Sequence, residues 1–184
     1  MSKSRPVYES FALEPAGRAH LVVTSLDAPP EGIEDSLANI EVWTVKHNGP
    51  GVPAQATPGV RPFRSTTELL AQLSHRLTRE TAGLRLYAVG PEAFVWDAYN
   101  AAMAAGLHPS EISLHRAGPF VRRVYCSHCR TMIEDVAQNI VTCPSCEAAL
   151  FVRDHFSRRL AAFMGVKVDA EVPGEIPEAE VFTS

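Results

Sequence analysis

The stretch of sequence that says most about the fold is a pair of cysteine turns, Cys126-Ser127-His128-Cys129 and Cys143-Pro144-Ser145-Cys146, separated by residues 130–142. The chain has four cysteines, and all of them lie in these two turns. Two such turns facing each other place four thiolates in a tetrahedral cage for one metal ion. Two disulfides are the alternative, but paired turns of this kind in a chain without a secretory signal usually bind metal. The sequence therefore predicts four metal ligands: Cys126, Cys129, Cys143 and Cys146.

The identity of the metal stays open between zinc and iron, because both suit four sulfur ligands. Zinc would only stabilise the fold, whereas iron would make a one-electron relay of the rubredoxin kind. Rubredoxin-like turns usually carry glycine after the second cysteine, and here Arg130 and Glu147 occupy those positions. This difference slightly favours zinc. His128 could also bind metal, but four cysteines complete the cage, so we expect His128 to be exposed to solvent.

The composition is that of an ordinary soluble globular protein, with 46% hydrophobic residues and a net charge of -4 in 184 residues. An acidic chain has no overall basic field, so nucleic acid is not an expected partner. There is no run of about 18 apolar residues that could span a membrane. The polar start, residues 1–10, does not resemble a signal peptide, so we expect a cytoplasmic protein with reduced thiols.

Before the cysteine turns, the hydrophobic pattern alternates between strands and helices. Strands are predicted at residues 20–24, 40–45, 84–89 and 111–115, and a Pro- and Gly-rich loop at 47–64. One helix begins at a Ser65/Glu68 capping box and is expected to end at Gly83. A second begins with Pro91 as its first helical residue and ends at Gly106. Strand, helix, strand, helix, strand in succession predicts an α/β domain with a parallel sheet and right-handed crossovers.

Changes in composition suggest four segments along the chain. These are an irregular leader (1–18), an α/β domain (19–118), a four-cysteine ribbon with a short helix near 156–164 (119–168), and an acidic extended tail (169–184). Arginines gather around the ribbon and suggest a docking surface for an acidic partner, or else an ordinary solvated face: Arg122, Arg123, Arg130, Arg153, Arg158 and Arg159.

The α/β segment contains Leu86-Tyr87-Ala88-Val89-Gly90-Pro91, then a helix, Gly106 and a strand at 112–115. This order resembles the last βαβ unit of the ferredoxin–NADP reductase family, and it implies a Rossmann-like, reductase-like scaffold. Two features depart from that family: no cysteine precedes Gly90-Pro91, and the first strand leads into residues 25–30 without a glycine-rich phosphate loop. A dinucleotide pyrophosphate needs bare backbone near a helix N-terminus. We therefore expect this domain to bind no nucleotide.

The C-terminal sequence, from Cys143-Pro144-Ser145-Cys146 through residues 150–171, is similar to the small subunit of bacterial dimethylamine monooxygenase, the DmmA-type family. The resemblance implies a multi-subunit, NADPH-dependent complex that demethylates dimethylamine oxidatively to methylamine and formaldehyde. It implies a flavin/iron–sulfur reductase subunit and an oxygen-activating subunit as partners. The role of this chain would be assembly of the complex, with electron transfer through the four-cysteine site as a possible second role.

The sequence identifies no catalytic or cofactor-binding residue and no ligand set for haem. Asp154, His155, Ser157 and Arg158 have the residue types of a catalytic triad, but triad members usually come from separate segments. We expect His155, Arg158 and Arg159 to form a polar face on a short helix instead. One alternative function is a zinc-ribbon adaptor that binds a protein or nucleic acid without a redox role. Another is a self-sufficient NAD(P)H reductase, which the missing glycine-rich loop argues against.

Overall fold

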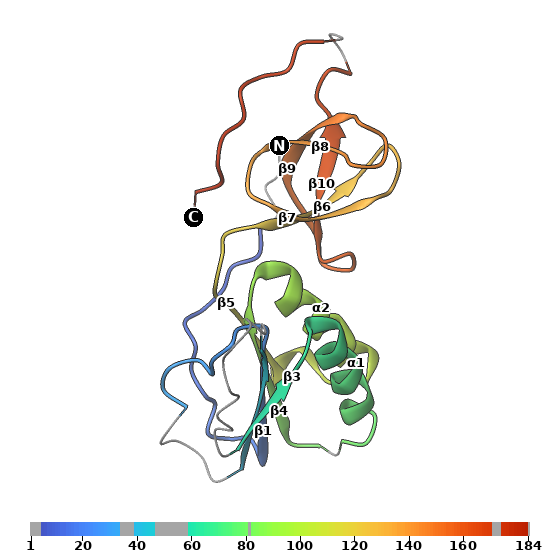
Figure 1. Cartoon of the computed structure of the whole chain (residues 1–184). Helices are drawn as coiled ribbons and strands as arrows, with labels where there is room; N and C mark the ends of the chain where they lie inside the picture. The colour runs from blue at the N-terminus through green and yellow to red at the C-terminus, as the bar shows by residue number, and fades with distance from the viewer. Residues whose placement is uncertain (1–4, 34–38, 47–58, 81, 171–173, 184) are drawn as a thin grey trace. The chain divides into compact units, whose positions relative to one another are not determined.

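The computed structural model describes residues 5–33, 39–46, 59–80, 82–170 and 174–183. The chain divides into two compact units (Figure 1). The N-terminal unit is Tyr8–Gly118, and the C-terminal unit is Pro119–Ser184 together with Met1–Val7. None of the helices in the described ranges has the length and apolar character needed to cross a membrane.

The N-terminal unit is built on a five-stranded sheet in the order β3-β2-β1-β4-β5, and every neighbouring pair is parallel. Val22 lies opposite Val42 on one side and Tyr87 on the other. The prediction of an α/β domain with a parallel sheet is therefore confirmed. The elements in chain order are β1 (Ala19–Thr24), β2 (Ile40–Val45), β3 (Val60–Phe63), α1 (Thr66–Leu77), β4 (Leu84–Gly90), α2 (Glu92–Ala104), a short 3-10 helix (Pro109–Glu111) and β5 (Ile112–Arg116).

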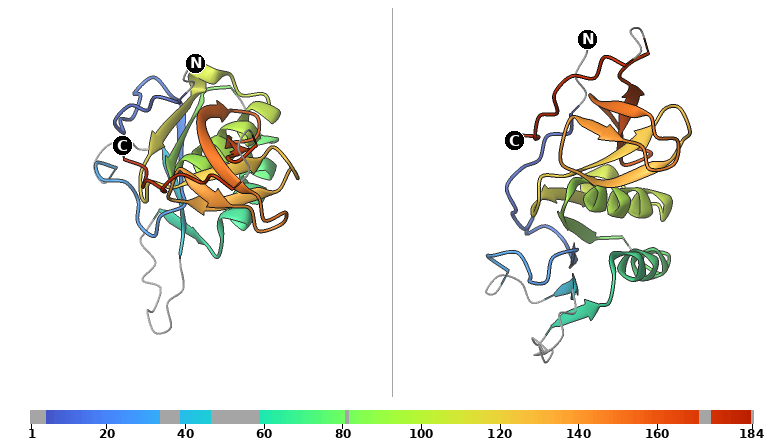
Figure 2. Two further views of the ribbon diagram at one scale, coloured as in Figure 1. Left: turned by 90° about the horizontal axis from the view of Figure 1, so that it is seen from above. Right: turned by 45° about the horizontal axis from the view of Figure 1, so that its top comes forward.

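Both faces of this sheet are covered, which explains why β1 and β4 read as nearly continuous apolar runs. Helices α1 and α2 lie side by side on one face (Figure 2). On the other face, Phe11 and Leu13 pack against the core cluster that contains Val22 and Tyr87. Residues 5–18 form no helix or strand, and the part from Tyr8 onward is packed into the N-terminal unit.

The helix boundaries follow the predicted signals with some differences. Ser65 caps α1, because its hydroxyl accepts a hydrogen bond from the Glu68 amide at 3.1 Å. A capping box predicts that the Glu68 carboxylate accepts a hydrogen bond from the Ser65 amide. It accepts one from the Arg64 amide instead, one residue earlier. The prediction that α1 ends at Gly83 is wrong, because the helix ends at Leu77 and Gly83 instead turns the chain into β4 with a φ of 105°.

Helix α2 begins at Glu92, so Pro91 is its N-cap and not its first helical residue. Gly106 ends it as predicted, with a φ of 94°. The amide of Leu107 donates to the carbonyl of Ala102, and that of Gly106 donates to Met103, both at 3.1 Å. These two bonds form a Schellman motif.

Strand β3 corrects the predicted loop at 47–64. Val60–Phe63 pairs in parallel with β2 at the edge of the sheet, where Pro62 is tolerated because one side of the strand needs no donor. The part of the predicted loop at 47–58 lies outside the described residues.

The C-terminal unit holds a second five-stranded sheet, in the order β7-β6-β10-β9-β8. Strands β6 and β10 are parallel, and the other neighbours are antiparallel. The strands are β6 (Arg122–Cys126), β7 (Met132–Val136), β8 (Ile140–Thr142), β9 (Ala149–Ser157) and β10 (Ala162–Lys167).

The predicted short helix at 156–164 is wrong, because these residues form the hairpin between β9 and β10. Phe156 and Phe163 pair across it, with their ring centroids 5.0 Å apart in the core. The part of the predicted tail at 174–183 forms no helix and no strand longer than a single bridge. It does not run free, because Val181 forms an antiparallel bridge with Gln138.

Candidate metal centre

The four cysteines lie in two turns that have the same backbone hydrogen bonds. Cys126 ends β6 and its turn leads to β7, while Cys143 follows β8 and its turn leads to β9. The amide of the first cysteine donates to the carbonyl five residues later, Cys126 to Thr131 and Cys143 to Ala148, both at 2.9 Å. The amide four residues later donates back to the first cysteine, also at 2.9 Å in both turns. The two turns are therefore two copies of one local structure.

The residue after the second cysteine adopts the left-handed conformation in both turns. Arg130 has a φ of 68° and Glu147 a φ of 58°. This is the region that favours glycine, so the chain adopts the glycine-type turn without glycine. The backbone of both turns therefore suits either zinc or iron.

The sulfur positions match the cage that one tetrahedral ion requires. All four Sγ atoms lie within 4.8 Å of one another, with 3.8 Å between Cys126 and Cys146 and 3.5 Å between Cys129 and Cys143. Metal–sulfur bonds of about 2.3 Å at tetrahedral angles give sulfur separations of about 3.8 Å. A disulfide would need a separation of about 2.05 Å, and all four cysteines are free thiols. The four cysteines can therefore bind one metal ion.

The cage is anchored in the core on one side and open on the other. Cys126 and Cys143 are buried and form a core cluster with Leu150, whereas Cys129 and Cys146 are half-buried. Within the first turn, His128 is exposed, as expected.

The local hydrogen bonds act differently on the two half-buried thiols. Hydrogen bonds from the Thr131 hydroxyl and amide lower the pKa of Cys129 to about 6. The Ala148 amide lowers the pKa of Cys146, but burial and the other three thiols raise it by more, to about 12. Four like charges so close together repel one another, so a bound cation is needed before all four sulfurs ionise.

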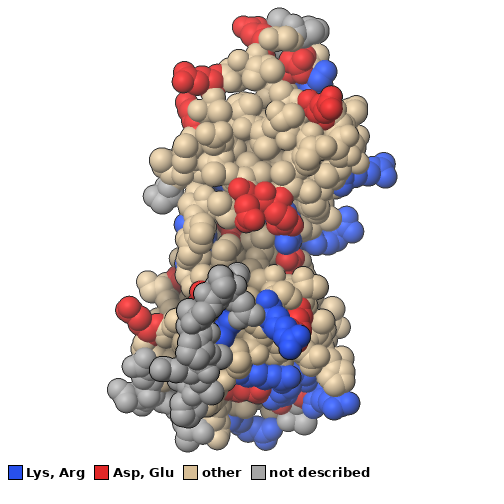
Figure 3. Space-filling model, viewed as in Figure 1, with Lys and Arg blue, Asp and Glu red and all other residues tan. Residues whose placement is uncertain are grey.

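The arginines that sequence grouped around the ribbon have different roles. Arg122 is 3% exposed and lies between the rings of Phe163 and Phe182, 4.1 and 4.0 Å from their centroids. Arg123 forms an ion pair with Glu134 at 2.7 Å. Arg130, Arg153, Arg158 and Arg159 are exposed. Figure 3 shows a broad uncharged area over the C-terminal unit, with Lys and Arg side chains near one margin.

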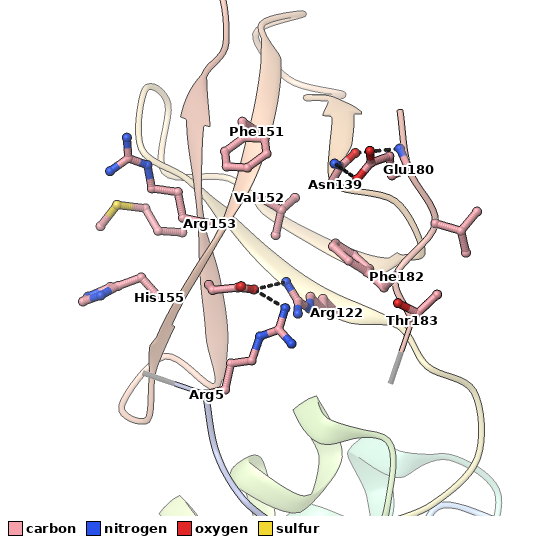
Figure 4. Close-up of a pocket in the computed structure, with 13 residues that line it drawn as sticks. Arg5, Arg122, Asn139, Phe151, Val152, Arg153, His155, Glu180, Phe182 and Thr183 are labelled. Atoms are coloured by element: carbon pink, nitrogen blue, oxygen red, sulfur yellow. Dashed lines mark hydrogen bonds and ion pairs between the residues drawn. The ribbon is translucent and has the colours of Figure 1, made fainter. Parts of the chain in front are cut away.

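Asp154 and His155 do not come together as parts of a catalytic triad. Arg5 and Arg122 direct their guanidinium groups at the Asp154 carboxylate, at 2.6 and 3.1 Å (Figure 4). Partial burial raises the pKa of Asp154, but the two arginines lower it by more and hold it below its usual range. His155 is exposed on the next position of β9. Sequence reasoning gave no sign of Arg5, since the partner of an ion pair so distant in sequence leaves no local pattern.

In the N-terminal unit, the turn from β4 into α2 is closely packed. A Cβ atom on Gly90 would lie 2.5 Å from Ser25 Oγ and 3.0 Å from the Phe94 ring. At the start of α2, where phosphate would bind, Glu92 accepts a hydrogen bond of 2.7 Å from the Tyr8 hydroxyl. A carboxylate there repels phosphate. Sequence reasoning missed Tyr8, which lies in the segment read only as a leader.

A parallel α/β unit and a small β unit with a four-thiol cage define a two-part protein that can bind a metal ion. Comparison with known proteins gives the family. The model "Dimethylamine monooxygenase subunit DmmA-like, N-terminal domain" matches residues 45–112, and the corresponding C-terminal domain model matches residues 123–166. The heme-dependent oxidative N-demethylase delta subunit of Ectopseudomonas mendocina (strain ymp) is 36% identical over 170 residues, covering 92% of this chain and 91% of the relative.

No solved structure matches the chain. The relative matches nearly the whole length of the chain, and the two family models match residues 45–112 and 123–166 within it. The chain therefore belongs to the DmmA-like family of dimethylamine monooxygenase subunits.

Proposed function

We propose that this chain is a subunit of an amine monooxygenase complex that removes a methyl group oxidatively, from dimethylamine to methylamine and formaldehyde, at the expense of NADPH. Its role is to hold the complex together and, with iron in the cage, to pass electrons. The observation that carries the proposal is a complete four-cysteine cage in a chain similar over 92% of its length to an oxidative N-demethylase subunit. Its partners are a flavin/iron–sulfur reductase subunit and an oxygen-activating subunit, in the cytoplasm.

We propose Cys126, Cys129, Cys143 and Cys146 as the ligands of a single zinc or iron ion. Either ion cross-links two turns that come from different parts of the sheet, and iron adds a one-electron couple. The protein holds two sulfurs in the core and leaves Cys129 and Cys146 half-buried. Any electron exchange with a partner would therefore take place on the side of the second cysteine of each turn.

The relative is named as haem-dependent, but the two buried histidines of the described residues do not fit a haem site. An axial histidine must present its ring nitrogen to an open pocket. The buried His20 and His115 both stack on Tyr87, and Phe11 meets His115 edge-on at 5.1 Å. We therefore place the haem of such a complex in another subunit.

The N-terminal unit is proposed as a reductase-like scaffold that binds no dinucleotide. The support is the packing of Ser25 and Phe94 around Gly90 and the carboxylate of Glu92 at the start of α2. Titration calorimetry with NADPH should give no binding heat. Saturable binding would contradict this part of the proposal and would favour a self-sufficient reductase.

The whole proposal is tested by reconstitution. The companion subunits should oxidise NADPH and form formaldehyde from dimethylamine at full rate only when this chain is present. Metal analysis and a visible spectrum of the chain then decide the second role: iron with a charge-transfer band that bleaches on reduction supports the relay, and colourless zinc restricts the chain to assembly. Full turnover without the chain would contradict the proposed function and favour an adaptor with no redox role.

A further inference from the structure

The outward face of β9 carries exposed apolar and basic side chains together. Phe151, Arg153 and His155 alternate along the strand and are all exposed. Met164 on the neighbouring strand β10 is exposed as well. Phe151 and Met164 keep 39% and 37% of their surface open to solvent, which is high for large apolar side chains. These four residues are called the β9 surface.

A bulge in the sheet shapes this surface. Val152 lies opposite Gly165 and Phe156 lies opposite Phe163, so residues 153–155 of β9 face only Met164 of β10. Bulges re-aim side chains and often occur next to functional sites. A cavity of about 830 Å³ is lined by all four residues of the β9 surface, and also by Arg5, Arg122, Asp154 and the tail residues 180–183.

The acidic residue within the bulge does not neutralise this surface. The Asp154 carboxylate is bound by Arg5 and Arg122, on the opposite side of the strand from Arg153 and His155 (Figure 4). Within the described part of the chain, neither Arg153 nor His155 has an ion pair or hydrogen bond. Arg153 therefore offers its full set of donors, and the imidazole of His155 offers another.

The chain's own tail lines the same cavity, but it pairs with the segment before β8 and not with β9. Residues 180–182 run antiparallel to 137–139, with amide–carbonyl bonds of 2.9 Å from Asn139 to Glu180 and from Phe182 to Ala137. The Phe182 ring covers the guanidinium of Arg122. This tail segment is extended and carries an acidic and an aromatic residue. Its aromatic ring packs on the guanidinium of an arginine.

We propose that the β9 surface is the docking site for an acidic, extended segment of a companion subunit, whose carboxylates meet Arg153 and His155 and whose apolar side chains cover Phe151 and Met164. This inference rests on the proposed function, since it needs a companion subunit. Met, aromatic residues and Arg are the types enriched at protein interfaces, and complementary charge steers association. An acidic partner complements Arg153 and His155, because the two carboxylates that line the same cavity already have partners: Asp154 is bound by Arg5 and Arg122, and Glu180 by Asn139.

The test is co-expression with the companion subunits, followed by purification through this chain. In the double variant R153E/H155E, the amount of companion subunit retained should fall at least tenfold, because like charges now face each other across the interface. The matched control is H75E/R79E, which makes the same changes at exposed positions of the N-terminal unit. The control should retain its companions, and both variants should keep the metal content of the unaltered chain.

A second variant, F151S/M164S, separates the apolar contribution, and it should also retain less companion subunit at unchanged metal content. Retention of companions by R153E/H155E at the level of the control would overturn the docking site while leaving the proposed function intact. A failure of the unaltered chain to retain any companion would refute the proposed function and, with it, this inference. If the purified chain self-associates and R153E/H155E abolishes this, the β9 surface binds a second copy of the chain. That result would overturn the proposal of a companion segment.

Discussion

Replacing Cys143 with serine tests the metal cage most directly. Cys143 is fully buried, and its sulfur lies 3.5 Å from that of Cys129. Serine leaves three thiolates and one hydroxyl that does not ionise near neutral pH. A structural four-ligand zinc site contributes about 10 kcal/mol or more to folding, while small domains are stable by only about 5–15 kcal/mol. We therefore expect Cys143→Ser to lose its metal and most of the net stability of the C-terminal unit.

The assay is metal content per chain, combined with thermal unfolding followed by calorimetry. The variant should hold less than about a tenth of an ion per chain, and the transition of the C-terminal unit should disappear while that of the N-terminal unit stays. Ser145→Ala is the matched control, because Ser145 lies exposed in the same turn and donates nothing to the cage. One metal ion per chain and unchanged unfolding in Cys143→Ser would refute the four-cysteine site.

Three further substitutions probe the packing around the centre and the helix signals. Asp154→Asn should cost about 2 kcal/mol, between the values for exposed and buried ion pairs, because it leaves two arginines without their carboxylate. Since the folded pKa of Asp154 lies below the unfolded value of about 3.9, its contribution is present above that pH and is lost as the pH falls through the folded pKa. Acid unfolding of the variant should therefore depend less on pH, and an unchanged acid profile would contradict this. Gly165→Ala should destabilise the C-terminal unit by about 1–3 kcal/mol, because the new Cβ would lie 2.7 Å from Val124 Cγ1; denaturant unfolding that matches the unaltered chain would show that the strands shift freely. Ser65→Ala should cost the N-terminal unit about 1 kcal/mol through loss of the helix cap, measured by urea unfolding, and no loss would mean that water replaces the cap.

The features that sequence predicted well are those encoded locally. The cysteine spacing determines the two turns, because each turn closes through hydrogen bonds within five residues of its first cysteine. Likewise, Ser65 and Gly106 mark helix ends through contacts one turn away. The parallel sheet followed from the order of its strands and helices, a property of the chain as a whole.

The features that sequence reasoning missed depend on distant partners. Val60–Phe63 looks like loop because of Pro62, and only its place at the sheet edge makes a strand possible. Residues 156–164 contain good helix formers, but pairing across the hairpin buries Phe156 and Phe163 and overrides that preference. The arginine cluster looked uniform, yet burial of Arg122 leaves only part of it for a partner.

The ion pair between Arg5 and Asp154 joins residues 149 positions apart, and the whole N-terminal unit lies between them in the chain. During synthesis, Arg5 leaves the ribosome long before its carboxylate partner exists, and the α/β unit can complete its own sheet in the meantime. The C-terminal unit then assembles around a segment that was made before the α/β unit, so this one ion pair links the two ends of the folding sequence.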